Sequence, residues 1–202
     1  MAAKRLALAF VLLALAACGG GSTKLEKLAA GDVVLAFGDS LTHGTGANPA
    51  ESYPAALERG IGRKVVNAGV PGETSAEGLA RLPGVLDEVR PKLLVLCHGG
   101  NDFLRRLDEN AARDNVRAMI ALARSKGVDV ILLATPKPGV PPSIPAFYGE
   151  VAVDLRVPFE ETVIRTVLLD NRLKSDLVHP NAQGYAQIAD AVKKLLQKSG
   201  AL

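Results

Sequence analysis

Mainly apolar runs alternate with helix-like segments along most of the chain, and this alternation limits the possible folds more than any other feature. Four of the runs are typical of short strands buried on both faces, and they lie at residues 33–37, 64–68, 93–97 and 128–134. A further run, 157–159, predicts a strand at an edge. Strands that alternate with helices form parallel sheets covered by helices on both faces. The sequence therefore predicts an α/β fold with three layers, α/β/α.

The segments between the runs predict the helices. They lie at residues 53–61, 75–89, 108–125, 146–156 and 181–198. In the third of them, Val116, Met119 and Ile120 fall on one face, as in an amphipathic helix. Pro83 is expected to split or kink the second, because proline lacks the N–H for a helical hydrogen bond. Residues 135–145 contain five prolines and predict a loop.

Length and charge narrow the class of protein. The chain has 202 residues, of which 48% are hydrophobic, and a formal net charge of +3. One domain is expected, because a domain of about 150 residues or more already buries roughly 70% of its unfolded surface. Lys4 and Arg5 lie in a segment that we expect to be removed, which leaves a mature chain near +1. No basic stretch alternates with aromatic residues, so no nucleic-acid partner is predicted.

The N-terminus has the pattern of an export signal. Lys4 and Arg5 precede an apolar run, residues 6–17, that is too short for a membrane-spanning helix of about 20 residues. The run ends in small residues before Cys18, and glycines and a serine follow it. This pattern resembles a bacterial lipobox, in which the cysteine is lipidated and becomes the new N-terminus. Acyl chains on Cys18 would anchor the protein to a membrane.

An ordinary signal peptide, with its cleavage site at Ala14–Ala16, is the alternative. The lipobox predicts a signal peptide at 1–17, a lipidated cysteine with a flexible linker at 18–31, and one folded domain at 32–202. The residue after Cys18 is not Asp, which resembles outer-membrane sorting in Gram-negative bacteria. We therefore expect an exported lipoprotein of the bacterial cell envelope, at the outer membrane and facing the periplasm. Cys97 then has no partner and is expected to be a core residue.

Turns of small residues follow the first three predicted strands. They are Gly-Asp-Ser at 38–40, Gly-Val-Pro-Gly at 69–72 and Gly-Gly-Asn-Asp at 99–102. In parallel α/β sheets, ligands bind beyond the carboxyl ends of the strands. We therefore expect the three turns to converge at one edge of the sheet and to form the site.

Ser40 could be a nucleophile at that edge, or only the cap of a helix. A serine nucleophile needs a base, and the chain has three histidines. His43 is too near Ser40 in sequence for good geometry, and His98 is expected to be packed or hydrogen-bonded at a strand end. His179 follows Asp176 by three residues, so the carboxylate can hold one ring nitrogen while the other takes the Ser40 proton. A surface Asp–His pair at the start of a helix is the alternative.

Acyl transfer also needs donors for the negative charge that develops on the carbonyl oxygen. The candidates are the N–H of Ser40, the N–H of Gly72 and the side-chain amide of Asn101. Taken one at a time, the glycine and the asparagine could equally be ordinary turn residues.

Four segments occur in the order of the sequence blocks of SGNH/GDSL hydrolases. They are Phe-Gly-Asp-Ser-Leu-Thr at 37–42, Asn-Ala-Gly-Val-Pro-Gly-Glu-Thr at 67–74, Gly-Gly-Asn-Asp at 99–102 and Asp-Leu-Val-His-Pro-Asn at 176–181. Over residues 33–198 the chain resembles this family, above all its bacterial periplasmic thioesterase/lysophospholipases and arylesterases. The resemblance implies a flavodoxin-like sandwich with five parallel strands and a hydrolase domain at 32–202.

The same resemblance implies a catalytic triad of Ser40, Asp176 and His179, and an oxyanion hole formed by Ser40, Gly72 and Asn101. It implies a monomeric serine esterase that needs no metal or cofactor and cleaves carboxylic esters or thioesters, lipid esters among them. An O-acetyl esterase acting on cell-envelope polysaccharide is the alternative among enzymes. A non-catalytic lipoprotein that binds glycan or lipid is the alternative from another class.

Overall fold

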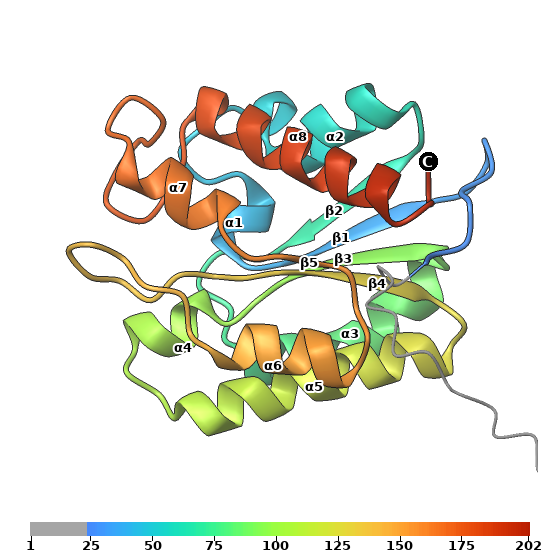
Figure 1. Cartoon of the computed structure of the whole chain (residues 1–202), viewed down its shortest axis with the longest axis horizontal. Coiled ribbons are helices and arrows are strands. Elements are labelled where there is room, and N and C mark those ends of the chain that lie inside the picture. The colour runs from blue at the N-terminus through green and yellow to red at the C-terminus, as the bar shows by residue number, and fades with distance from the viewer. Residues whose placement is uncertain (1–23) are drawn as a thin grey trace, which may run out of the picture.

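A parallel sheet lies between two layers of helices in the computed structural model, which describes residues 24–202 (Figure 1). The strands are β1 (Val34–Gly38), β2 (Val65–Gly69), β3 (Leu93–Cys97), β4 (Asp129–Leu133) and β5 (Phe159–Glu160). Their order in the sheet is β2-β1-β3-β4-β5, and every neighbouring pair is parallel. The predicted fold class and the five parallel strands are confirmed, and each strand begins and ends within a residue or two of its predicted position.

The strand order reverses between β1 and β3, and this reversal decides where a ligand can bind. From β1 the chain moves outward to β2 and then returns past β1 to β3. Right-handed crossovers therefore place α2 (Tyr53–Ile61) and α3 (Ser75–Val89) on opposite faces of the sheet, as Figure 1 shows. The connections diverge at the carboxyl ends of β1 and β3 and leave a crevice there.

The helices divide evenly between the two faces of the sheet (Figure 1). One face carries α1 (Ser40–His43), α2, α7 (Val163–Leu169) and α8 (Ala182–Lys198), and a short 3-10 helix, η1 (Pro49–Glu51), leads into α2. The other face carries α3, α4 (Gly100–Leu104), α5 (Glu109–Ser125) and α6 (Phe147–Asp154). Neighbouring residues of one strand enter different cores, since Val34 packs below α2 and α8 while Leu35 packs against α3 and α5. This explains why the strands are apolar at nearly every position.

Several helical features differ from the prediction, and the short α4 and η1 were not predicted. Pro83 lies inside α3, which runs as one helix, so the predicted split does not occur. Leu82 and Leu86 are buried on the face that packs against α5, and this packing offsets the missing hydrogen bond. The sequence analysis missed α7, although Ile164 and Val167 are buried at helical spacing and would have indicated it.

Residues 24–31, at the end of the predicted linker, contact the C-terminal residues of the domain. The N–H of Leu25 donates to the Ser199 carbonyl at 2.8 Å, and that of Leu28 donates to the Ala201 carbonyl at 2.9 Å. Leu28 is only 3% exposed, because it packs into the core beside the end of α8. The predicted signal peptide at 1–17 and the predicted lipidation site, Cys18, lie outside the described residues. Within residues 24–202, no helix is long and apolar enough to cross a membrane.

Candidate active site

The turn after β1 places Ser40 at the carboxyl edge of the sheet. Gly38 approaches β3 so closely that a Cβ atom would lie 2.0 Å from the Cys97 carbonyl oxygen, so only glycine fits there. Asp39 caps α1, because its carboxylate accepts a hydrogen bond from the Leu41 N–H at 3.0 Å. Burial raises the pKa of the Asp39 carboxyl. Ser40 is therefore the first residue of α1, with its hydroxyl at the mouth of the crevice.

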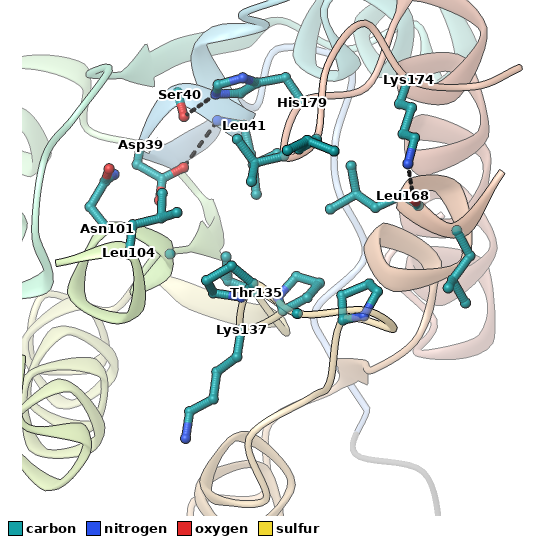
Figure 2. A pocket seen from close by; sticks show the side chains of 18 of the residues that line it. Asp39, Ser40, Leu41, Asn101, Leu104, Thr135, Lys137, Leu168, Lys174 and His179 are labelled. Atoms are coloured by element: carbon teal, nitrogen blue, oxygen red, sulfur yellow. Dashed lines mark hydrogen bonds between the residues drawn. The ribbon is translucent and has the colours of Figure 1, made fainter. Parts of the chain in front are cut away.

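Three of the predicted site residues meet at this edge, and Figure 2 shows two of them, Ser40 and His179. The Oγ atom of Ser40 lies 3.0 Å from Nε2 of His179, although 139 positions separate the two residues in sequence. On the other side of the ring, Nδ1 of His179 lies 2.8 Å from a carboxylate oxygen of Asp176. The structure thus joins the predicted nucleophile, base and orienting carboxylate by two consecutive hydrogen bonds.

The loop that carries Asp176 settles which ring nitrogen of His179 bears the proton. Burial raises the pKa of the Asp176 carboxyl, but hydrogen bonds from the His179 ring and from the N–H groups of Val178 and His179 outweigh it, so this pKa is lowered. An ionised carboxylate can only accept, which means that Nδ1 donates to Asp176. Neutral His179 then has Nε2 free to accept the hydroxyl proton of Ser40.

The three candidate oxyanion donors each follow the end of a strand: Ser40 follows β1, Gly72 follows β2 and Asn101 follows β3. Asn101 is only 9% exposed at the start of α4, and one hydrogen of its side-chain amide goes to the Glu73 carbonyl at 3.0 Å. The other hydrogen remains for a ligand. Gly72 has φ +81°, a conformation that other residues rarely adopt. Within the described residues, neither the N–H of Ser40 nor that of Gly72 donates to a protein acceptor.

An apolar cavity of about 580 Å³ opens beside Ser40 and Asn101 (Figure 2). Its walls are the proline-rich loop 136–142 and the side chains of Leu41, Leu104, Leu168, Leu169, Leu177 and Val178. The sequence analysis named none of these side chains as part of the site, and of residues 135–145 it predicted only that they form a loop. Leu168 and Leu169 belong to α7, so the missed helix is also a missed wall of the cavity.

The other histidines and the cysteine lie apart from the reacting groups. His43 is exposed and does not line the cavity. His98 is fully buried and contacts Glu73, in keeping with the expectation that it is packed or hydrogen-bonded. Cys97 is a buried core residue, as predicted, and burial raises the pKa of its thiol. Among residues 24–202, no group of three His, Cys, Asp or Glu side chains could hold a metal ion.

A serine whose hydroxyl meets a histidine, with a carboxylate behind that histidine, is the geometry by which serine hydrolases are recognised on unrelated folds. Here the arrangement stands at the switch point of a five-stranded parallel sheet. Residues 36–187 match the GDSL-like lipase/acylhydrolase family, and the chain belongs to this family. It is accordingly an ester hydrolase of the SGNH type.

Named relatives agree with this assignment. The chain is 36% identical over 172 residues to the esterase TesA of Pseudomonas aeruginosa, a match that covers 77% of this chain and 83% of the relative. It is 30% identical to thioesterase 1/protease 1/lysophospholipase L1 of Escherichia coli, over 85% of this chain and 86% of that protein. Among solved structures, the crystal structure of TesA superposes with a TM-score of 0.73 and 29% identity, covering 82% of this chain and 98% of the other.

Proposed function

We propose that Ser40, His179 and Asp176 are the catalytic triad of this esterase. The observation that carries the proposal is the unbroken chain of hydrogen bonds from the Ser40 hydroxyl through both nitrogens of His179 to Asp176. His179 removes the Ser40 proton as Ser40 attacks the carbonyl carbon of an ester or thioester. His179 then gives that proton to the leaving alcohol or thiol, and an acyl-enzyme remains on Ser40. Water activated by His179 releases the acid and restores Ser40.

The oxyanion that forms in each step would lie between the N–H groups of Ser40 and Gly72 and the side chain of Asn101. The two N–H groups without a protein acceptor, together with the remaining amide hydrogen of Asn101, support this placement. Such donors are effective because they point at the developing charge before the reaction begins.

The apolar cavity beside Ser40 is the proposed site for the acyl group of the substrate. Its volume of about 580 Å³ and its leucine, valine and proline walls suit an aliphatic chain better than a sugar. Esters and thioesters of aliphatic acids are therefore the proposed substrates, and the names of two relatives, an esterase and a thioesterase/lysophospholipase, agree with cleavage of esters and thioesters. A panel of p-nitrophenyl esters from acetyl to dodecanoyl tests this. Cleavage of acetylated glycans without cleavage of hexanoyl or longer esters would instead make the protein an O-acetyl esterase.

A fluorophosphonate probe tests the nucleophile directly, because it forms a covalent adduct only with an activated serine. The wild-type chain should acquire one adduct on Ser40, located by peptide mass spectrometry, and Ser40→Ala should acquire none. Ser125→Ala removes a hydroxyl that only contacts the carbonyl of Leu122 in its own helix, and this variant should be labelled like the wild type. No adduct on Ser40 of the folded wild-type chain would favour a non-catalytic binding protein.

We further propose that the chain is an exported lipoprotein held at a bacterial membrane by lipid on Cys18. The sequence of residues 1–22 supports this, with its two basic residues, its apolar run and its cysteine beside small residues. The proposed organisation is a signal peptide at 1–17, the lipidated cysteine with a short linker, and a monomeric hydrolase domain. Metabolic labelling with a fatty acid should fail in Cys18→Ser, and equal labelling of the two proteins would exclude the anchor.

A further inference from the structure

Glu73 is a buried acid next to the proposed oxyanion hole. It takes no part in the proposed reaction of Ser40, His179 and Asp176. It is 7% exposed and follows Gly72 directly. One carboxylate oxygen accepts from Nε of Arg81 at 2.6 Å, and the other accepts from a terminal nitrogen of the same guanidinium at 2.7 Å. The second oxygen also lies 3.0 Å from Nε2 of His98. Both oxygens thus face side chains from other parts of the fold, Arg81 and His98.

His98 can only donate a hydrogen bond to Glu73, because its other ring nitrogen is already an acceptor. Its Nδ1 accepts the N–H of Gly99 at 3.1 Å, so Nε2 carries the proton and donates it to Glu73. The ring is fully buried, and the backbone of Gly78 packs against it so closely that a Cβ atom there would lie 2.2 Å from Nε2. His98 is therefore locked in place as a donor to Glu73.

Arg81 connects the same carboxylate to two strands. Its guanidinium lies over the ring of Phe37, 4.2 Å from the ring centre, and donates to the Ala68 carbonyl at 3.0 Å. Phe37 belongs to β1 and Ala68 to β2, while His98 directly follows β3. The Glu73 carboxylate thus joins the carboxyl ends of the three strands that precede Ser40, Gly72 and Asn101.

The main chain of Glu73 touches the proposed oxyanion donors themselves. Its carbonyl accepts the side-chain amide of Asn101 at 3.0 Å. Its N–H donates to the Val70 carbonyl at 3.2 Å, which closes the turn that contains Gly72. A shift of Glu73 would therefore move the N–H of Gly72 and the amide of Asn101 at once.

From these contacts we infer that the Arg81–Glu73–His98 cluster is a positioning device that aligns Gly72 and Asn101 toward the oxyanion. The inference rests on the proposed function, since it assigns a support to that site. None of the three side chains touches the substrate, and the cluster acts through the turn 70–73. Oxyanion donors work only when their alignment precedes the reaction, and a displacement of about 1 Å at a site can cost roughly 10²-fold in rate.

Glu73→Gln tests the inference, because glutamine keeps the length of the side chain and removes the charge that both partners share. We expect kcat for a p-nitrophenyl ester to fall at least tenfold while KM stays within threefold. The acid limb of the pH–rate profile should stay where it is in the wild type, because Glu73 moves no proton. Glu77→Gln is the matched control. Glu77 lies in the first turn of α3, four residues after Glu73, and its carboxylate bonds only to Thr74, so the kcat of this variant should match the wild type.

A double-mutant cycle distinguishes alignment of the hole from general damage. In an Asn101→Ala background one of the aligned donors is already absent, so Glu73→Gln should cost at least threefold less than it does in the wild type. Equal costs in the two backgrounds would overturn the inference, as would a Glu73→Gln enzyme whose kcat lies within threefold of the wild type. If Glu73→Gln does not fold, Arg81→Met and His98→Leu each remove one partner. Wild-type kcat in both of these variants would be equally decisive against the inference.

An NMR measurement separates this inference from the proposed function. The order parameter of the Gly72 N–H should fall from the value of rigid backbone, about 0.85, to below about 0.6 in Glu73→Gln, and it should be unchanged in Glu77→Gln. This measurement needs no catalysis. A wild-type chain without esterase activity would refute the function, whereas an unchanged Gly72 order parameter in Glu73→Gln would refute only the positioning device.

Discussion

Gly78 offers a test of the packing around His98. Alanine usually stabilises a helix when it replaces glycine, but at this position it should destabilise the protein. Inside a helix, replacing glycine by alanine ordinarily stabilises a protein by about 0.5–1 kcal/mol. In α3 the new Cβ atom would lie 2.2 Å from Nε2 and 2.8 Å from Cδ2 of His98. The ring cannot retreat, because it is fully buried and hydrogen-bonded at both nitrogens.

The expected magnitude follows from these contacts. Overpacking a tight core costs about 1–3 kcal/mol, and loosening a buried hydrogen bond adds about 1–3 kcal/mol. After the helical gain is subtracted, Gly78→Ala should lower the free energy of unfolding by about 1–5 kcal/mol, and Tm by roughly 2–20 °C for a domain of this size. Gly84 is the matched control in the same helix, because a Cβ atom there meets nothing within 4 Å. Gly84→Ala should gain about 0.5–1 kcal/mol.

Thermal and urea unfolding followed by circular dichroism, with the two variants and the wild type side by side, provide the measurement. Gly78→Ala should lower the free energy of unfolding, whereas Gly84→Ala should raise it. The kcat value should fall in Gly78→Ala alone, since a displaced His98 disturbs Glu73. A Gly78→Ala protein as stable as the wild type, or shifted in the same direction as Gly84→Ala, would refute this account of the packing.

Three further outcomes are expected. Asn101→Ala should lower kcat by about 10²–10³ with KM less affected, and a loss below threefold in steady-state kinetics would remove Asn101 from the oxyanion hole. The rate should fall at acid pH as His179 becomes protonated; a flat profile from pH 5 to 8, with chemistry shown to limit the rate, would speak against its role as base. Burial raises the pKa of Glu73, but Arg81 and His98 outweigh it and lower this pKa to about 2 from 4.5. Its stabilisation, about 1–3 kcal/mol after screening, is thus present above pH 4.5 and lost as the pH falls toward 2. Urea unfolding measured at pH 3 and at pH 6 gives the free energy of unfolding at each pH. The loss of this free energy between pH 6 and pH 3 should be smaller in Glu73→Gln than in the wild type.

The elements of the sheet could be predicted because burial leaves a regular pattern in the sequence. A strand covered on both faces is apolar at nearly every position, and α5 shows its buried face at helical spacing. Parallel strands present their carboxyl ends at one edge, so the convergence of Ser40, Gly72 and Asn101 also followed from the alternation alone. The short α7 was missed because it lies in the long connection between β5 and α8, where no flanking pattern draws attention to it.

The position of His179 depends on loop hydrogen bonds that leave no periodic pattern in the sequence. The N–H of Ser175 donates to the His179 carbonyl at 2.9 Å, and the N–H of Asn181 donates to the Leu173 carbonyl at 2.9 Å, so the loop folds back on itself. The Tyr185 hydroxyl then donates to the Thr45 carbonyl at 2.8 Å and holds the start of α8 near the segment after α1. The spacing of Asp176 and His179 indicates that they can pair, but only these contacts bring the pair to Ser40.

The residues that support the site, Glu73 and His98, could not be paired from the sequence for a related reason. His98 was expected to be packed or hydrogen-bonded, and Glu73 stood within a recognised block, yet nothing in their separation of 25 positions links them. Their meeting requires β2 and β3 to lie on opposite sides of β1 while α3 crosses back along one face of the sheet, a consequence of strand order rather than of local pattern. The residues that perform the chemistry are therefore recognisable by type and spacing. Those that hold them in place are recognisable only once the topology is known, because a buried Glu–His pair in this position contributes to no periodic face.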